Sequence, residues 1–468
     1  MKKLYTLIFF LSTTLVSSVN AQLNNHVSAR LQSVLDSTCA KYIIKGASAA
    51  ILVPGIGTWK GVYGVSHPGE AVKSEMLFGI GSNTKTYTSC IMLKLQEMGK
   101  LSLTDTIGKW IHNQKYISGK ITIKQILNHT SGLFSFTDNP DFNDSMLADF
   151  SRIWTPEEAL RFVLAPTFKP GASWAYSNTN YIIAGIIIKQ VMNQPYEVTL
   201  RDFIFDPQGF QNSVLIPQET AKSPIAYQWS IGVNGTNQLP IFDLPGYSNN
   251  AFYSLAYSAG AIFQTAEDNV NFWHNLMTGK IIAMNSLSQF KKCVTIGSGP
   301  NGGAVGYGLG VFRYYNFLNK RPIYEHGGTA LGYIAENAVD TISGICFSVL
   351  TNQDSVSNDI LLTQVIGALH KVTLEMDMSG ISPESYKSDN IKIYPNPASD
   401  LIQIETSITG GQSDLSLFDM TGKEVFSQEI NNNKSEINIA QLPEGLYVAR
   451  ITDLKNQAKY SQKIQIKH

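Results

Sequence analysis

Residues 78–85 have the sequence Phe78-Gly79-Ile80-Gly81-Ser82-Asn83-Thr84-Lys85, in which a strand-like end and glycines lead into a helical pattern. The pattern predicts a helix over 82–98, stopped by Gly99. Ser82 then lies at the helix N-terminus, and Lys85 follows one turn later on the same face. A serine hydroxyl becomes nucleophilic when a neighbouring base takes its proton, and free amides at a helix N-terminus favour an oxyanion. The stretch therefore predicts a serine nucleophile with a lysine base.

The Ser-x-x-Lys spacing alone is a weak signal, because it occurs a second time at residues 288–291. That copy lacks the glycine entry and is typical of an ordinary amphipathic helix. For Ser82 itself, a capping serine followed by an exposed lysine is the alternative interpretation. The choice between them depends on the rest of the chain.

Two further motifs supply that context. Tyr176 and Asn178 form a Tyr-x-Asn directly before an apolar helix expected over 181–191, although the same pattern also occurs at 247–249 and 314–316. A phenol on such a loop can shuttle a proton while the amide holds a substrate carbonyl. The third motif follows a strand and comprises Tyr324-Glu325-His326-Gly327-Gly328-Thr329. Its glycines let the backbone approach a ligand closely, although a histidine before glycines is often a plain strand-end residue.

In this order the three motifs resemble those of the serine β-lactamase and penicillin-binding protein superfamily, which are Ser-x-x-Lys, Tyr-x-Asn and Lys-Thr-Gly or a variant. Residues 25–370 are similar to the branch that holds class C β-lactamases, D-Ala-D-Ala carboxypeptidases and related esterases. Supporting stretches are 99–105, 127–133, 258–260 and 265–268. The resemblance implies an α+β fold in which helices flank an antiparallel sheet, with a helical subdomain. It also implies that no metal or organic cofactor is needed.

The resemblance also implies roles for the first two motifs. Ser82 is the acylated nucleophile, and Lys85 is its base or the group that holds it. Tyr176 exchanges a proton with Ser82 and then with the leaving group, and nearby cations are expected to lower its phenol pKa. Asn178 orients the substrate amide.

For the third motif, the resemblance makes His326 a replacement for the usual lysine and an electropositive partner of the tyrosine. The backbone amides of Ser82 and Thr329 form the oxyanion hole, and Gly327 and Gly328 line the substrate. One departure is Gly327, which stands where the family commonly has a threonine or serine that binds a substrate carboxylate.

Arg313 is a candidate to compensate for that missing hydroxyl. If a hairpin of 307–315 and 321–326 turns at Asn319 and Lys320, Arg313 lies opposite His326 on the same sheet face. A guanidinium there could bind a carboxylate bidentately. A solvated strand arginine is the alternative, so peptidase, β-lactamase and esterase activity all stay open.

Composition divides the chain into four parts. A positive start, an apolar stretch and a small-residue cleavage site predict a secretory signal peptide over 1–21. Residues 22–375 form the hydrolase domain, and the polar passage 376–390 is a linker. Short alternating strands over 391–468 predict a small all-β sandwich.

Motifs in 391–468 resemble the type A sorting domain of type IX secretion. They are Tyr394-Pro395-Asn396-Pro397, Asp419 with Thr421-Gly422-Lys423, and Gly445-Leu446-Tyr447-Val448. The resemblance implies export through the periplasm of a Gram-negative cell to the outer surface or medium, with the domain cleaved or used for attachment. A plain adhesion or carbohydrate-binding module is the alternative.

Charge and cysteine content exclude other classes. Lys plus Arg and Asp plus Glu both total 36, whereas nucleic-acid binders usually carry a basic excess. The longest apolar stretch of the mature chain, 181–188, is too short to span a membrane. The four cysteines are widely spaced and lack zinc-ligand spacing, so we expect structural cysteines with at most one bridge.

These observations predict a secreted serine hydrolase, most like a D-Ala-D-Ala carboxypeptidase. Its substrate is a small peptide, a β-lactam or an ester, and its partner in export is the type IX secretion machinery. A β-lactamase or esterase is the alternative within the fold. A non-catalytic cell-surface binding protein is the alternative outside it.

Overall fold

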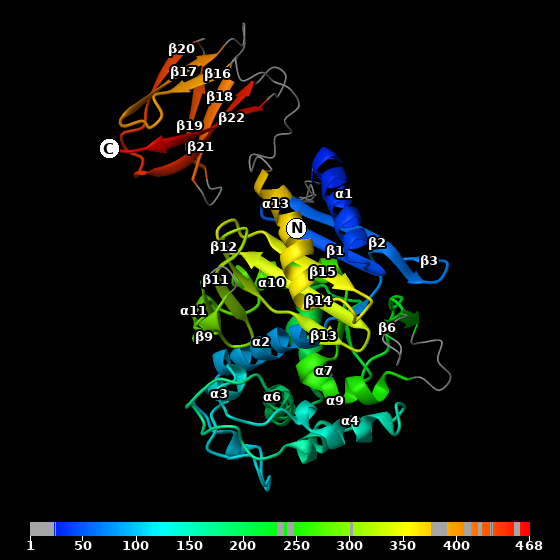
Figure 1. Cartoon of the computed structure of the whole chain (residues 1–468). Helices are drawn as coiled ribbons and strands as arrows, with labels where there is room; N and C mark the ends of the chain where they lie inside the picture. Colours follow the sequence, from blue (N-terminus) through cyan, green and yellow to red (C-terminus); the bar gives the residue numbers. More distant parts are fainter. Residues whose placement is uncertain are drawn as a thin grey trace, which may run out of the picture.

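A ten-stranded sheet organises the larger part of the chain (Figure 1). The computed structural model describes residues 23, 25–231, 238–240, 248–299, 303–375, 391–406, 413–419, 424–430, 432, 434–453 and 459–468. The expected signal peptide and linker lie outside these residues. In sheet order the strands are β3 (Glu70–Ala71), β2 (Gly57–His67), β1 (Gly46–Val53), β15 (Cys346–Thr351), β14 (Tyr333–Asp340), β12 (Arg321–Glu325), β11 (Phe312–Leu318), β10 (Ala304–Tyr307) and β9 (Val294–Ser298), with β13 (Gly328–Ala330) beside β14.

Neighbouring strands of this sheet run antiparallel, and helices cover both of its faces. On one face, α1 (Asn25–Lys41) packs beside α13 (Gly367–Glu375), and their apolar side chains share a core with β1 and β15 (Figure 1). On the other face, α10 (Ala266–Met277) packs against β1 and β15. The expected α+β fold is confirmed.

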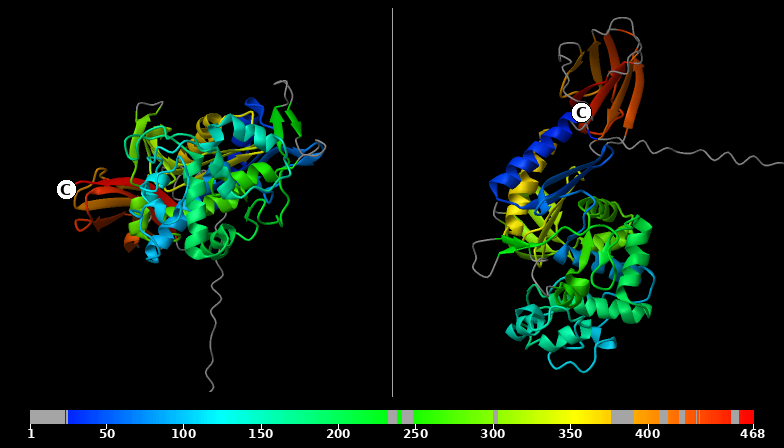
Figure 2. Two further views of the ribbon diagram at one scale, coloured as in Figure 1. Left: turned by 90° about the horizontal axis from the view of Figure 1, so that it is seen from below. Right: turned by 90° about the vertical axis from the view of Figure 1, so that its right-hand side faces the viewer.

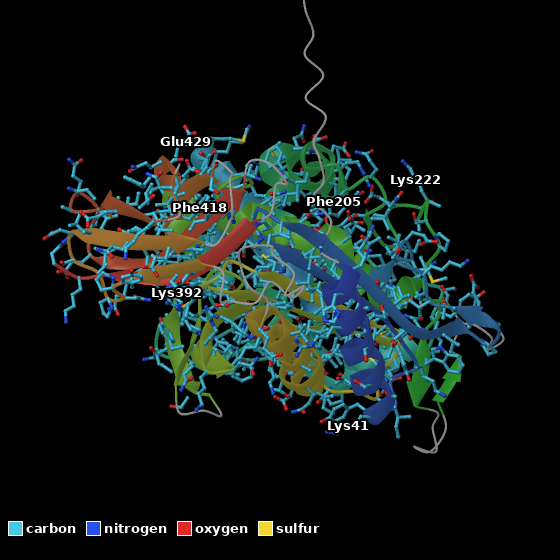
Figure 3. The ribbon with its side chains drawn as sticks, turned by 90° about the horizontal axis from the view of Figure 1, so that it is seen from above. Lys41, Phe205, Lys222, Lys392, Phe418 and Glu429 are labelled. Carbon is cyan, nitrogen blue, oxygen red and sulfur yellow. The ribbon has the colours of Figure 1, made fainter. Side chains whose placement is uncertain are left out.

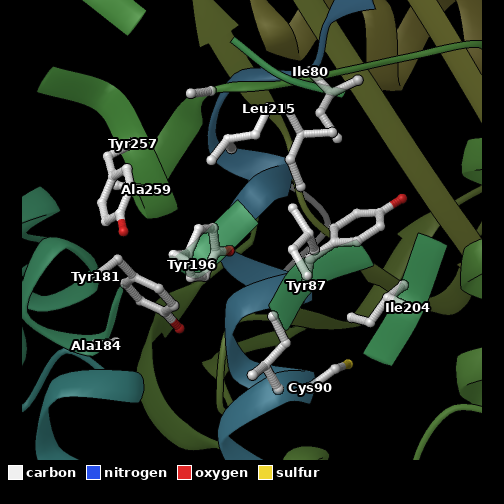
Figure 4. Packing of buried hydrophobic residues seen from close by; sticks show 14 of the residues in the cluster. Ile80, Tyr87, Cys90, Tyr181, Ala184, Tyr196, Ile204, Leu215, Tyr257 and Ala259 are labelled. Atoms are coloured by element: carbon white, nitrogen blue, oxygen red, sulfur yellow. The ribbon is translucent and has the colours of Figure 1, made fainter. Parts of the chain in front are cut away.

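A helical region lies at one end of the sheet, as Figures 1 and 2 show, with α2 in blue and most of the other helices in cyan and green. Its helices are α2 (Thr84–Glu97), α3 (Ile123–Leu127), α4 (Pro140–Leu147), α5 (Pro156–Ala159), α6 (Asn178–Met192), α7 (Tyr196–Leu200), α8 (Asp206–Gln208), α9 (Asn250–Gly260) and α11 (Met284–Phe290). Figure 4 shows how Tyr87 and Cys90 of α2 pack among Tyr181, Tyr196 and Ile204. Because α2 is surrounded in this way, the residues at its N-terminus are held rigidly.

The local signals of the sequence mostly form the elements expected of them. The helix expected over 82–98 is a 3₁₀ turn, η1 (Gly81–Asn83), followed by α2. It ends at Gly99, whose φ of 68° and bond from its amide to Gln96 O are typical of a glycine helix stop. The apolar helix expected over 181–191 is α6, which begins at Asn178.

One expected element is different. The strand expected over 307–315 is two strands, because β10 ends at Tyr307 and β11 begins at Phe312. Gly310, at a φ of 82°, and a bond from the Gly308 amide to Val311 O turn the chain between them.

The C-terminal segment forms two small sheets around their own core. One contains β16 (Ile391–Tyr394), β17 (Leu401–Thr406) and β20 (Lys434–Asn438), and the other contains β19 (Glu424–Ile430), β18 (Ser413–Phe418), β21 (Gly445–Asp453) and β22 (Lys459–Ile466). Apolar residues of both sheets share one cluster, which is the expected sandwich. Charged side chains such as Lys392 and Glu429 extend outward from it (Figure 3).

Candidate active site

Ser82 lies in η1, between β4 (Phe78–Gly79) and α2, with its backbone against β13. Gly81 has a φ of 51°, and a Cβ on it would lie 2.7–2.8 Å from the backbone of Thr329. A Cβ on Gly328 would lie 1.9 Å from Ile80 O and 2.9 Å from the Ser82 nitrogen. The two glycines are therefore what allow the backbones of Ser82 and Thr329 to lie side by side.

Lys85 is buried directly behind Ser82. Its Nζ lies 2.9 Å from Ser82 Oγ and donates a hydrogen bond to Ala259 O at 2.8 Å. The side chain is 0% exposed, and burial holds the pKa of Lys85 well below its usual range. An uncharged amine has a lone pair that can accept the serine proton, so the geometry suits general-base chemistry.

Tyr176 also faces this pair, and Lys85 Nζ lies 4.9 Å from the centre of its ring. Burial raises the pKa of Tyr176, and the hydrogen bond with Ser82 only partly opposes this. The expectation of a lowered phenol pKa is therefore wrong. The reason is that burial disfavours the charged phenolate, and this effect outweighs the hydrogen bond that lowers the pKa.

His326 is uncharged as well. It is 1% exposed, and burial lowers its pKa to about 3. Its Nδ1 donates to Gly327 O at 2.7 Å, which leaves Nε2 to accept from the Tyr307 hydroxyl at 3.1 Å. His326 therefore orders the third motif as a neutral imidazole, and the expectation that it supplies positive charge to Tyr176 is wrong.

Ser82, Asn178 and Thr329 meet at one cavity of about 80 Å³. Its remaining lining residues are Phe136, Thr137, Phe142, Phe252, Ala256, Ala259 and Gly260. Asn178 is the first residue of α6, and its Nδ2 donates to Thr137 Oγ1 at 3.1 Å. Phe252 and Ala256 lie on α9.

Arg313 lies elsewhere. The hairpin does turn at Asn319 and Lys320, both of which have positive φ, but the register shifts between Tyr314 and Leu318. Arg313 therefore pairs with Tyr324, two residues short of His326, and its guanidinium lies 5.2 Å from the centre of the Tyr324 ring. The expected position opposite His326 is wrong, because an irregularity in the ladder moves the whole register.

His129 is a site residue that the motif analysis left without a role. The Ala175 amide donates to His129 O at 3.1 Å, and the Ser177 amide donates to His129 Nδ1 at 3.2 Å. These two bonds hold the residues on either side of Tyr176, and the rings of His129 and Tyr176 lie 4.4 Å apart. The stretch 127–133 was noted only for its resemblance, and spacing alone does not show which later loop it contacts.

The second Ser-x-x-Lys does not form a comparable site. Ser288 is exposed on α11 and donates to Met284 O at 2.9 Å. All four cysteines are unpaired, and no group of metal-ligating side chains gathers in the described part of the chain.

Comparison with known proteins places this geometry in a family. A family model described as "Beta-lactamase" matches residues 23–369, about three quarters of the chain. The chain belongs to the β-lactamase family. A second model, described as "Secretion system C-terminal sorting domain", matches residues 392–467.

Three relatives illustrate the likeness. Penicillin-binding protein 4 of Amycolatopsis lactamdurans is 26% identical over 337 residues, 69% of this chain and 85% of that protein. A D-stereospecific amidohydrolase from Streptomyces sp. has a TM-score of 0.63 and 27% identity, covering 73% of this chain and 98% of that one. The D-amino acid amidase from Ochrobactrum anthropi SV3 shares the fold, with a TM-score of 0.62 and 23% identity. The match covers 75% of this chain and 99% of that one.

The β-lactamase-family domain is thus followed by a sorting domain, which indicates type IX secretion to the cell surface or beyond. None of the helices that the structure describes has the length and apolar character of a membrane span.

Proposed function

We propose that this β-lactamase-family protein is a secreted serine hydrolase that forms an acyl-enzyme on Ser82 and cleaves peptide or amide bonds in the manner of a D-Ala-D-Ala carboxypeptidase. The observation that carries the proposal is the buried Lys85 Nζ, whose pKa is lowered by burial, 2.9 Å from Ser82 Oγ and behind the cavity that Asn178 and Thr329 line.

In this mechanism Ser82 Oγ attacks the substrate carbonyl carbon while its proton passes to Lys85 Nζ. The carbonyl oxygen takes up the negative charge and is bound by the Ser82 and Thr329 amides. The proton then returns through the Tyr176 hydroxyl to the leaving nitrogen as the C–N bond breaks. Water attacks the resulting ester, which releases a carboxylic acid and restores the Ser82 hydroxyl.

Two features would let Tyr176 act as a relay. Its raised pKa keeps the phenol protonated, so it passes on a proton and does not act as a phenolate base. His129 holds the backbone on both sides of it, which limits its movement. The apolar side chains of Phe136, Phe142 and Phe252 suit an acyl group with an apolar side chain.

The test is intact mass of the mature protein after incubation with benzylpenicillin, beside Ser82→Ala and Ser288→Ala. We expect an adduct of one penicillin on the wild-type protein and on Ser288→Ala, and none on Ser82→Ala. Release of D-alanine from an N-acyl-D-Ala-D-Ala peptide then measures the peptidase reaction. An adduct that decays rapidly indicates a β-lactamase. If no adduct forms and neither penicillin, peptide nor ester is hydrolysed, the protein is a non-catalytic binding protein.

Hydrolysis of D-amino acid amides is a second candidate. It is favoured by the D-stereospecific amidohydrolase likeness and by the third motif, in which Gly327 offers no hydroxyl and Arg313 is paired with Tyr324. Both features reduce the means of binding a free carboxylate on the leaving group. Release of ammonia from D-phenylalanine amide, compared with release of D-alanine from the peptide, separates the two reactions.

The sorting domain supports export through the periplasm and across the outer membrane, ending in release or surface attachment. Fractionation of the native host, with and without residues 391–468, tests this. Retention of the shortened chain in the periplasm is the expected result.

A further inference from the structure

Gly327, the departure in the third motif, faces a buried acid. A Cβ on Gly327 would lie 2.1 Å from Glu336 Oε1 and 2.8 Å from Asn358 Nδ2. Glu336 is on β14 and is only 2% exposed. The space that a side chain at position 327 would need is therefore already occupied by the Glu336 carboxyl group and the Asn358 amide.

Asn358 links that carboxyl group to the strand beside Ser82. Its Nδ2 donates to Glu336 Oε1 at 2.6 Å and to Ala335 O on β14 at 3.2 Å. Its Oδ1 accepts the hydroxyl of Thr329 at 2.7 Å. A continuous chain of hydrogen bonds thus joins Glu336, through Asn358, to the residue whose amide the proposed mechanism places at the oxyanion.

The strand that carries Thr329 is short. β13 has three residues, and its ladder partner is β14 on one side, while the backbone of Ser82 lies against it on the other. A strand this short gains few ladder bonds, so a side-chain bond that ties β13 to β14 has a large influence on its position.

The environment of Glu336 suits a fixed hydrogen-bond acceptor. Burial and the nearby Glu325 raise the pKa of Glu336, and Asp359 raises it further. Glu325 on β12 also has a raised pKa because of burial. A raised pKa favours the uncharged carboxyl group, which still has a carbonyl oxygen to accept from Asn358.

We propose that Glu336 and Asn358 are positioning residues that hold β13, and with it the Thr329 amide, in place beside Ser82. The proposal rests on the proposed function, since it assigns the Thr329 amide to the oxyanion. It also explains Gly327, because the residue that the family commonly has there is incompatible with a carboxyl group at this place.

Three variants and a neighbouring control test the proposal. Asn358→Ala and Glu336→Ala break the hydrogen bonds that connect Glu336 through Asn358 to Thr329. Glu336→Gln keeps an acceptor oxygen for Asn358. Asp359→Asn removes an exposed charge beside Asn358, which weakens its effect on the pKa of Glu336 but breaks none of these hydrogen bonds, so it is the matched control. The first readout is the rate of Ser82 labelling by an uncharged fluorophosphonate, which needs the nucleophile and the oxyanion donors but no peptide-binding site.

We expect Asn358→Ala and Glu336→Ala to label about tenfold to hundredfold more slowly, since loss of an oxyanion donor outright costs about 10²–10³ in rate. The loss should lie in the maximal rate, with little change in the reagent concentration for half-saturation. Glu336→Gln and Asp359→Asn should stay within about threefold of the wild type. Wild-type rates for both alanine variants would overturn the proposal.

Backbone hydrogen exchange gives a second readout that does not depend on activity. If Asn358 positions β13, amide hydrogen exchange over residues 326–332 should be faster in Asn358→Ala than in the wild type. Exchange in β15 should be the same in both proteins. Unchanged exchange over 326–332, or an equal increase in β15, overturns the proposal. If wild-type Ser82 resists labelling altogether, the proposed function fails, and the exchange pattern still decides whether Asn358 positions β13.

Discussion

Gly327→Ala offers a quantitative test of the packing in the third motif. The new Cβ would lie 2.1 Å from Glu336 Oε1, whereas ordinary contacts begin at 3.4 Å. The carboxyl group or the backbone must move by about 1 Å, and overpacking of this kind costs about 1–3 kcal/mol. Glu336 is buried and bonded to Asn358, so it cannot turn away without losing that bond. We expect a free energy of unfolding lower by about 2 kcal/mol.

Differential scanning calorimetry of the full chain, following the transition of the larger domain, measures the effect. Glu336→Ala removes the closest obstructing atoms and leaves the 2.8 Å contact with Asn358 Nδ2. Most of the cost of Gly327→Ala should therefore vanish in the double variant, with a coupling energy of about 1–3 kcal/mol. Gly367→Ala is the control. Gly367 has helical φ and ψ of −58° and −42°, and its nearest neighbour is Leu318 Cδ1 at 3.6 Å, so this change should be neutral or stabilise by up to about 1 kcal/mol.

The reasoning fails if Gly327→Ala unfolds at the wild-type temperature. It also fails if the cost of Gly327→Ala is the same with and without the Glu336 side chain, because the clash would then lie with other atoms.

Three further predictions concern the nucleophile and a helix cap. Lys85→Met should slow acylation of Ser82 by about 100-fold or more, and wild-type acylation should fall as pH is lowered through the depressed pKa of Lys85, because the protonated amine cannot accept a proton. A pH–rate profile that is flat into acid would contradict this. Ser288→Ala should be acylated at the wild-type rate, which stopped-flow measurement checks, since its hydroxyl bonds the Met284 carbonyl on an exposed helix. Thr155→Ala should lower stability by about 1 kcal/mol, because the Thr155 hydroxyl accepts the Glu158 amide in a capping box. An unchanged calorimetric midpoint would show that the cap contributes nothing.

Local features of the structure were predictable because their causes are local. The capping box of Thr155 involves residues three apart, and the turn at Asn319 and Lys320 depends on two adjacent φ angles. The nearness of Ser82 and Lys85 follows from one helical turn. The family resemblance added Tyr176, Asn178 and Thr329 to this pair. The structure brings Asn178 and Thr329 to the Ser82 cavity and Tyr176 to the Lys85 side chain.

The register of Arg313 was not predictable in this way. Counting back from the correct turn places Arg313 opposite His326, but the irregularity between Tyr314 and Leu318 moves it to Tyr324. A bulge of this kind responds to packing across the sheet, which spacing along one strand does not reveal.

The sequence by itself determined which residues are candidates for the chemistry, since the order and spacing of Ser82, Lys85 and Tyr176 are properties of the chain. Tertiary structure alone decided their charge states and supports. The pKa of Lys85 is lowered because segments far apart in the sequence enclose it, among them Ala259, 174 residues away. Burial also lowers the pKa of His326, and the Glu336 carboxyl group lies where a side chain at position 327 would have to go. Desolvation and steric exclusion depend on every segment that packs around a group, and those segments meet only when the chain is folded.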